Sequence, residues 1–542
     1  MNINRFQLVC CVTLAIVELF IGGCGGAGKA KSQQNLNEPM PGGELGPTVG
    51  AISETFAFTQ TPVEGFSLVG ALNETGSTEC PPQIREYLEK YLMKQLPDQK
   101  DVGKFIDSPD TAVVIVYGIV PPAASKNQRF DIAVAALQDT ETSSLEGGIL
   151  WGADLSQSGQ LGGGAKVLAK AEGPVFIDTI DSNQPDKRTG YILGGGKILD
   201  DYKIRLVLRK PDYQLSNDIR NVLNGRFGSK TAIAVSPSQI DLNVPPKYKN
   251  QKERFIKMVR ATYLTQTQEL NAKRIDNFIA KLGTSPDKEA GEIALEAIGR
   301  LSLEKLASLL NSSNEEVRLR TSRCMLNLGS DEGLNKLRQI AMDEKSSYRI
   351  EAIEAVTAGA NRNDAAAISR KLLRDKNFDI RIAAYKQLEI LNDIVIREKS
   401  IADNFQLVQI DQMDHKGIFV TRNGQPRIVL FGSPIYFREG SYIQSRQGNI
   451  TINAPVGEKY VTIMRKHPRR PSVILQLKSS YALDDIIETL CGKPLSESQK
   501  GRSGLGVPYS DAIALLKQMC DKGAIEAEFK AGALPKIGQI IN

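Results

Sequence analysis

Residues 112–117 read Ala112-Val113-Val114-Ile115-Val116-Tyr117, and this apolar run opens the stretch 110–148, around which the fold is organised. A short run so rich in β-branched residues predicts a strand that is buried on both faces. Pro121 and Pro122 end the strand, because proline has no N–H to donate to a sheet. Beyond a polar turn, apolar residues occupy alternate positions from Phe130 to Ala136, which predicts a second strand with one apolar face.

Length and composition indicate a globular protein of several domains. The chain has 542 residues, too many for a single hydrophobic core, and its 41% hydrophobic and 24% charged residues are ordinary proportions. A net charge of +6 is small for this length, so we expect no nucleic acid partner. The basic cluster Arg465, Lys466, Arg469 and Arg470 is interpreted as a solvated loop, with an anion-binding patch as the alternative.

The sequence offers little for catalysis. It contains two histidines, His415 and His467, so a histidine-rich metal site is excluded and a Ser-His-acid triad would need one of the two. The glycines at 65–70 miss the spacing of a nucleophile elbow by one residue, and those at 194–196 lack the flanking residues of a phosphate loop. We therefore expect a protein that is not an enzyme, with no catalytic residues, no metal site and no cofactor.

The N-terminus has the pattern of an export signal. Arg5 precedes an apolar segment that Glu18 interrupts, which argues against a permanent membrane span. The segment ends Ile21-Gly22-Gly23-Cys24, which resembles the lipobox of bacterial lipoproteins. That resemblance implies a signal peptide at 1–23, a lipid anchor on Cys24 and, because Gly25 follows, sorting to the outer membrane. An ordinary secretory signal is the alternative. Residues 24–50 are mostly Gly, Pro, Ser, Asn and Gln, and we interpret them as a flexible tether.

Four cysteines remain after the signal: Cys80, Cys324, Cys491 and Cys520. Cys324 falls on an apolar helix face and is interpreted as an inert core residue. Cys491 and Cys520 each end a predicted helix, and they are candidates for a disulfide in an oxidising periplasm, with free thiols as the alternative.

Residues 51–265 form the first predicted globular region. Apolar residues at helical spacing after Pro81-Pro82 predict a helix that Pro97 stops. A second helix, 215–228, is predicted with Ser216 as its N-cap and Gly228 as its end. Short strands are predicted around Leu150, Val167, Val175, Ile192 and Ile240, and over 203–208.

Several motifs in this region, and others near the C-terminus, occur in a recognisable order. They are Phe66–Gly76, Pro121-Pro122, Gln128-Arg129-Phe130-Asp131-Ile132, Ser144-Leu145, Gly147-Gly148, Pro211-Asp212-Tyr213, Val244-Pro245, Leu483–Ile487, Gly506-Val507-Pro508, Asp511–Leu516 and Gly523–Glu528. In this order they resemble the motifs of the bacterial flagellar P-ring protein family. Glu74, where the family has glycine, and a longer loop at 492–505 depart from its pattern.

Between these two regions, residues 266–400 are helical and repetitive. Val317-Arg318, Tyr348-Arg349 and Ile380-Arg381 recur 31 and 32 residues apart, each after a polar turn and before an apolar helix. This pattern resembles HEAT-type repeats, with an ordinary helical bundle as the alternative. We expect the repeats to form an independent arm, with the polar segment 394–412 as the return of the chain.

Strands return in 401–542, over 417–421, 427–431, 449–452, 460–465 and 473–477, followed by helices over 480–490 and from Ser510, and a closing strand over 523–529. The predicted fold class is α+β: two P-ring-like halves of mixed strands and helices with an inserted all-α repeat domain.

The resemblance implies a structural protein of the flagellar basal body. It would form a homo-oligomeric periplasmic ring around the rod at the peptidoglycan layer, next to the outer ring, with Cys24 attaching it to the outer membrane. The alternative is a non-flagellar envelope lipoprotein whose repeats bind a protein partner. An enzyme-maturation lyase, a class in which short HEAT units also occur, is disfavoured because no catalytic set is visible.

Overall fold

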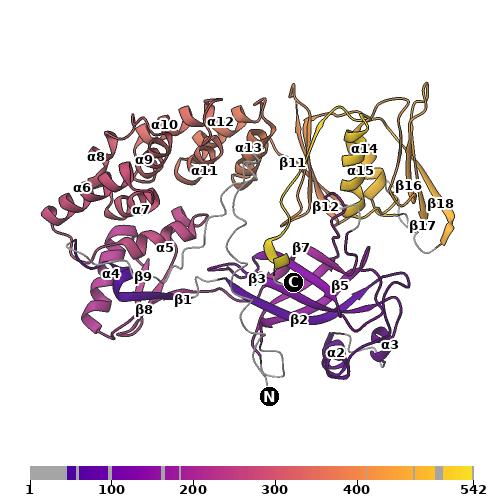
Figure 1. Ribbon diagram of the computed structural model, residues 1–542, viewed down its shortest axis with the longest axis horizontal. Helices are drawn as coiled ribbons and strands as arrows, with labels where there is room; N and C mark the ends of the chain where they lie inside the picture. Colours follow the sequence, from indigo (N-terminus) through magenta and orange to yellow (C-terminus); the bar gives the residue numbers. More distant parts are fainter. Residues whose placement is uncertain are drawn as a thin grey trace, which may run out of the picture. The chain divides into compact units, whose positions relative to one another are not determined.

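The computed structural model describes residues 45–56, 60–95, 101–159, 165–181, 185–411, 413–467, 470–494 and 504–539 (Figure 1). The predicted signal peptide, most of the tether and Cys24 lie outside these ranges. In the ranges described, no helix has the length and apolarity needed to cross a membrane. The fold class is α+β, as predicted.

Residues 112–136 contribute two strands to a closed barrel of six antiparallel strands. Its order is β2-β3-β4-β7-β6-β5, with β2 Thr61–Gly70, β3 Ala112–Val120, β4 Arg129–Ala136, β5 Ile149–Gln157, β6 Val167–Pro174 and β7 Thr189–Ile198. Val114, Val116, Ile132 and Val134 are buried in its interior. Helices α2 Pro82–Gln95 and α3 Gly103–Ile106 cover one outer face, where Val113 packs with Leu88 and Ile106.

The prediction for residues 112–117 is confirmed for its first half. Residues 112–114 are buried, whereas Ile115 and Tyr117 on the outer face are only half-buried, because the covering helices reach one end of β3. In β4 the expected alternation of burial fails after Asp131, since Ala133 and Ala135 are buried as well.

We predict that Val114→Asp will prevent stable folding. Val114 is fully buried in the barrel interior, between β2 and β4. An unpaired carboxylate there costs several kcal/mol, a large share of the stability of an ordinary domain. Thermal melts by circular dichroism test the prediction. A soluble mutant with an unchanged melting temperature would contradict it.

A second, smaller sheet follows the barrel. Its order is β1-β8-β10-β9, with β1 Ser53–Phe56, β8 Ile204–Leu208, β9 Ala232–Ala234 and β10 Gln239–Leu242, all antiparallel. Helix α1 Val49–Ile52 precedes it, and α4 Tyr213–Phe227 and α5 Lys252–Ala261 follow β8 and β10. Ser216 is not the N-cap of α4. Asp212 is extended and accepts a hydrogen bond from Leu215 N at 3.0 Å, whereas Ser216 is buried within the helix. Gly228 ends the helix as predicted, with φ of 109°.

Eight helices form the array: α6 Gln268–Thr284, α7 Lys288–Ile298, α8 Leu303–Ala307, α9 Glu315–Asn327, α10 Asp331–Met342, α11 Arg349–Gly359, α12 Arg362–Leu372 and α13 Phe378–Ile390. Each repeated arginine lies early in an odd-numbered helix. Arg318 donates to the carbonyls of Ser312 and Ser313, and Arg381 donates equivalently to those of Asp375 and Lys376. Arg349 donates to Ala341 O and pairs with Asp375. The repeated residue therefore fastens its helix to a preceding turn or helix end.

The array is also tied to the N-terminal region along its length. Arg226 of α4 donates to the carbonyls of Glu296 and Ala297 at the end of α7. Lys247 donates to Asn327 O at the end of α9, at 2.5 Å, and Gln251 donates to Ala358 O near the end of α11, at 3.0 Å. The C-termini of three alternate helices, α7, α9 and α11, lack internal partners for their last carbonyls and thus receive donors from residues 226–251.

The expectation of an independent arm is wrong. The far end of the array shares one hydrophobic core with the C-terminal region: Phe378 and Tyr385 of α13 pack edge-on against Phe431, with ring centroids 5.3 and 6.0 Å apart. The segment expected to return along the array instead forms β11 Arg397–Ile401 and β12 Phe405–Asp411, which pair with each other. Gln412 lies outside the described residues.

The C-terminal region consists of two sheets around two helices (Figure 1). One has the order β11-β12-β14-β13-β19, with β13 Gly417–Val420, β14 Arg427–Ser433 and β19 Glu528–Ala531. The other has the order β15-β16-β17-β18, with β15 Tyr442–Gln444, β16 Ile450–Asn453, β17 Val461–His467 and β18 Arg470–Ser479. The helices α14 Leu483–Cys491 and α15 Tyr509–Asp521 contribute apolar faces to the core between them.

Two predicted helix starts in this region are corrected. Helix α14 begins at Leu483 and not at Ser480, because Ala482 is still extended. Helix α15 begins at Tyr509, after Pro508, so Ser510 lies inside its first turn and caps nothing. The closing strand begins later than expected, because Gly523 turns the chain with φ of 68°.

Candidate functional site

Two features of the described residues are candidate sites: a joint between the barrel and the C-terminal sheets, and a groove beside α14. Within the ranges given above, no group of three or more His, Cys, Asp or Glu side chains is placed to bind a metal ion. His415 lies in the turn before β13, and His467 lies at the end of β17.

The joint centres on Asp131, a residue of the Gln-Arg-Phe-Asp motif. Its carboxylate on β4 accepts hydrogen bonds from Gly194 N at 2.7 Å and from Gly424 N at 2.8 Å. Gly424 lies in the turn between β13 and β14, and both glycines have positive φ, near 60°. Burial raises the pKa of Asp131, and the two amide donors partly offset that rise. The barrel strand thus holds a turn that is 293 residues away in the sequence.

A buried arginine and an apolar contact complete the joint. Arg422 donates to Gly532 O at 2.6 Å and to Asp178 at 3.1 Å, and it also pairs with Asp181. Phe176 and Ile180, which follow β6, are part of the C-terminal core, and the ring of Phe176 lies 6.1 Å from that of Tyr509. The barrel and the C-terminal sheets are therefore joined by a shared core and by charged hydrogen bonds.

We predict that Asp131→Ala will lower the free energy of unfolding by about 1–3 kcal/mol, because it leaves two partly buried amides without their acceptor. Asp131→Asn, which keeps one acceptor oxygen, should cost less. Denaturant unfolding measures both effects, and hydrogen exchange should show faster exchange at Gly424. Unchanged exchange at Gly424 in the alanine variant would contradict the role given to Asp131.

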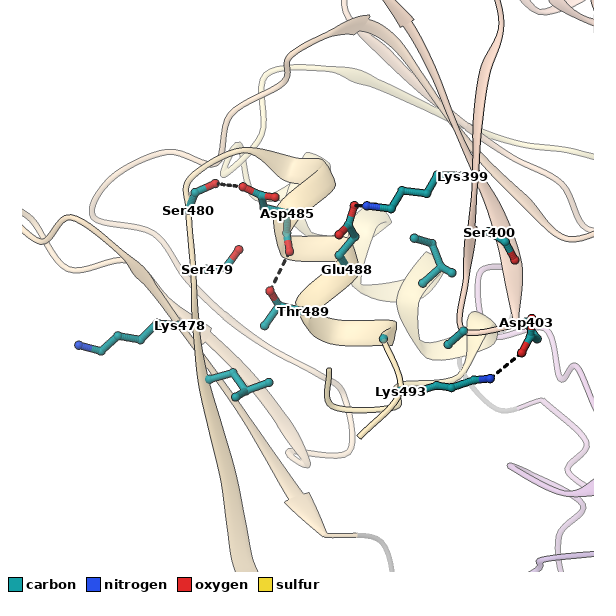
Figure 2. Close-up of a pocket in the computed structure, with 14 residues that line it drawn as sticks. Lys399, Ser400, Asp403, Lys478, Ser479, Ser480, Asp485, Glu488, Thr489 and Lys493 are labelled. Carbon is teal, nitrogen blue, oxygen red and sulfur yellow. Dashed lines mark hydrogen bonds and ion pairs between the residues drawn. The ribbon is translucent and has the colours of Figure 1, made fainter. Parts of the chain in front are cut away.

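The groove lies between two strands at the edges of the C-terminal sheets, with α14 between them (Figure 2). It has a volume of about 700 Å³. One wall comes from β11 and the turn after it, at Lys399–Asp403, and the other from Leu477–Ser479 of β18. Lys399 reaches across to pair with Glu488, and Lys493 pairs with Asp403 at 2.6 Å. These contacts pair two lysines of the groove with two of its carboxylates.

The predicted site residues fall in three different places. Cys24 lies outside the described ranges. Cys491 and Cys520 are both free thiols in the structure, so no disulfide joins them. Burial raises the pKa of Cys520 to about 12, and it raises that of Cys491 further, so both remain protonated at neutral pH. In the basic cluster, Arg465 points inward and donates to Leu505 O at 2.5 Å, so it is not part of a solvated loop.

Sequence reasoning missed most of the joint and the groove. The Asp131 motif was recognisable, but the identity of its partner at Gly424 was not, because one sequence carries no signal for contacts between distant turns. Arg422 had no signal at all: a lone arginine after a strand is usually solvated.

The joint is a structural contact, in which charged hydrogen bonds and a shared core hold two regions of the chain together. Residues 49–275 match the family model described as "Flagellar P-ring protein". The flagellar P-ring protein of Thermotoga maritima is 30% identical over 211 residues, which cover 36% of this chain and 60% of that relative. Those of Bradyrhizobium sp. and Anaeromyxobacter dehalogenans are 29% and 28% identical over 213 and 223 residues, covering 36% and 38% of this chain and 54% and 57% of each relative.

The resemblance to the flagellar P-ring family is therefore supported for the N-terminal region. The chain spans between 54% and 60% of the length of these relatives. The range of the family model ends within α6, so it includes neither the rest of the array nor the C-terminal motifs, whose resemblance remains a prediction.

Proposed function

We propose that this protein is a structural component of the bacterial flagellar basal body, where copies of it form the periplasmic ring around the rod. The observation that carries the proposal is the match of residues 49–275, which form the barrel and the small sheet, to the flagellar P-ring family. Its partners would be further copies of itself, the rod, the outer ring proteins and the peptidoglycan layer.

The proposal includes three features that extend the family pattern. Residues 1–23 would be a lipoprotein signal peptide and 24–50 a tether, with Cys24 lipidated in the outer membrane. Residues 266–400 would be an inserted HEAT-type repeat domain between P-ring-like regions at 51–265 and 401–542. The recurrence of Arg318, Arg349 and Arg381 early in successive odd-numbered helices supports the repeat assignment.

The direct test is isolation of basal bodies from the organism that encodes the protein. An epitope-tagged chain should co-purify with the rod, and a deletion strain should lose the periplasmic ring in electron micrographs and lose motility. Complementation with wild type should restore both, whereas the Val114→Asp variant, which we expect not to fold, should not. Intact rings in the deletion strain would overturn the proposal and favour the alternative of a non-flagellar envelope scaffold.

We predict that Cys24→Ser will abolish lipidation and release the protein from the membrane fraction. The hydroxyl of serine cannot take the thioether-linked diacylglycerol, so the chain would be retained with its signal or freed as a soluble species. Fractionation after carbonate washing, with mass spectrometry of the N-terminal peptide, tests this. Equal membrane association of both proteins and no acyl mass on the wild-type peptide would contradict the lipoprotein assignment.

A further inference from the structure

Two open strand edges face the same groove in the C-terminal region. Among the strands that the structure describes, β11 pairs only with β12, and β18 pairs only with β17. Residues 397–400 of β11 are exposed, as are most residues of β18. An open edge presents unpaired N–H and C=O groups that can hydrogen-bond to another extended segment.

The charges around the groove indicate what kind of segment it can accept. Lys399 pairs with Glu488, Lys493 pairs with Asp403, and Ser480 donates to Asp485 at 2.6 Å (Figure 2). Lys478 lies over the ring of Tyr460, 5.8 Å from its centroid. Because these groups are matched within the groove, it suits an uncharged segment that binds through its backbone.

The same chain carries such a segment at the other end of β18. Ile450, the first residue of β16, lies beside Arg465 of β17, and Arg465 in turn lies beside Leu475 of β18. The residues of β18 that precede Leu475 therefore extend beyond the end of β16. Residues 472–477 read Ser-Val-Ile-Leu-Gln-Leu and carry no charge. Leu475 and Leu477 pack against the core, whereas Val473 is 42% exposed and Ile474 is 59% exposed. This overhang, residues 472–474, lacks the charged residues that usually protect an edge strand.

We propose that the groove of one copy receives the overhang of a second copy, which adds a strand to the open edge of β11. The inference rests on the proposed ring function and names the contact between neighbouring copies. The overhang and the groove are different surfaces, with centres about 17 Å apart along β18 at 3.3 Å per residue. A contact between them is head-to-tail, so each copy gives its overhang to one neighbour and its groove to the other. Such contacts form a ring when the rotation closes.

Photo-crosslinking of the full-length chain tests the contact. A copy with p-benzoylphenylalanine in place of Ile474 is mixed with isotope-labelled wild type, irradiated and digested. We expect crosslinks from position 474 to labelled peptides that contain residues 397–403 or 485–493. The matched control places the same photoreactive residue at Val456, which is 81% exposed and lies in the turn between β16 and β17. It should give no crosslink to those peptides.

A substitution provides the second, independent measurement. Ile474→Lys should weaken self-association at least about tenfold, since the added charge would be desolvated beside groups that are already paired. Val456→Lys should leave it unchanged. Both side chains are exposed, so both variants should keep the wild-type melting temperature, and sedimentation equilibrium then reports association alone.

The proposal is overturned if wild type stays monomeric at 100 µM, if Ile474→Lys assembles like wild type, or if position 474 crosslinks only to another protein or to another face. Failure of the contact and failure of the ring function remain distinguishable. If the protein is present in basal bodies but position 474 gives no crosslink, only the proposed contact is rejected. If position 474 gives the crosslink but the protein is absent from basal bodies, only the flagellar role is rejected.

Discussion

Replacing Glu292 by alanine will lower the free energy of unfolding by about 3–5 kcal/mol, because it removes the buried carboxylate that three partly buried arginines share. Glu292 of α7 is fully buried. Arg323 of α9 binds both of its carboxylate oxygens at 2.6 Å, and Arg254 and Arg320 donate to it at 2.8 and 3.1 Å. Two-pronged pairs of this kind are among the strongest charged hydrogen bonds.

The matched control lies one turn earlier on the same helix. Glu289 pairs with Lys257 at 2.7 Å, but its side chain is much more exposed, so Glu289→Ala should cost less than about 1 kcal/mol. Urea unfolding of both variants measures the difference. Similar costs for the two substitutions would show that the buried network contributes no more than a surface pair.

The same network sets how stability depends on pH. Burial acts to raise the pKa of Glu292, but the arginines, Arg254 first among them, outweigh it, so this pKa is well below its ordinary value. A carboxylate whose pKa is lowered in the folded state stabilises the protein above its unfolded pKa, which is about 4.3, and this contribution is lost as the pH falls toward the folded pKa. The advantage of wild type over Glu292→Gln should therefore be full at pH 7 and shrink below about pH 4.

Local patterns were enough to predict most elements, because their causes are local. The run 112–117 gave β3, and the repeated Arg318, Arg349 and Arg381 marked three helices of the array. Helix starts were less reliable where several capping residues compete. Asp212 caps α4 although Ser216 looked equally suitable, since only the extended residue can cap.

The relation between the array and the rest of the chain could not be predicted from composition. A helical repeat with polar flanks has the sequence pattern of an inserted domain, and a long insertion costs little in loop entropy. The contacts that bind the array depend on single residues far away in the sequence. Gly417 of β13 is an example: a β-carbon at this position would lie 2.6 Å from the ring of Phe378, so the missing side chain lets α13 approach the sheet. Lys247 and Gln251 are residue types that are common on surfaces, so the sequence alone does not show that they donate to helix ends of the array.

The joint shows the same limit for the candidate site. The motif around Asp131 was evident, yet its role depends on a turn at Gly424 that has no distinctive sequence. Assembly surfaces are harder still to predict from a sequence, because a strand edge is open only where no other strand pairs with it. The uncharged run at 472–477 was readable as a strand, but only the sheet order shows that one of its edges is free.

Replacing residues 267–391 by a short Gly/Ser linker will give an aggregated chain without a cooperative thermal transition. The array covers one face of the C-terminal sheet, where Val408, Ile410, Phe419, Val429 and Phe431 are buried against its helices. Without it, this apolar face would be exposed to water, and such patches on a sheet favour aggregation. At the other end, Arg254 would lose both Glu292 and Glu296, its ion-pair partners in the array.

A point substitution separates this cause from a poorly chosen linker. Phe378→Ala removes the ring that packs against Gly417 and Phe431, and a cavity of this kind costs about 3–5 kcal/mol. The matched control is Phe56→Ala, since Phe56 is 51% exposed on β1 and its loss should cost less than about 1 kcal/mol. If Phe378→Ala has the melting temperature of wild type, and if the shortened chain stays monomeric with a sharp thermal transition, the array is a separate domain. If both are destabilised while Phe56→Ala is not, the helices and the C-terminal sheet fold as one body, and the array serves as part of the framework that holds that sheet in place.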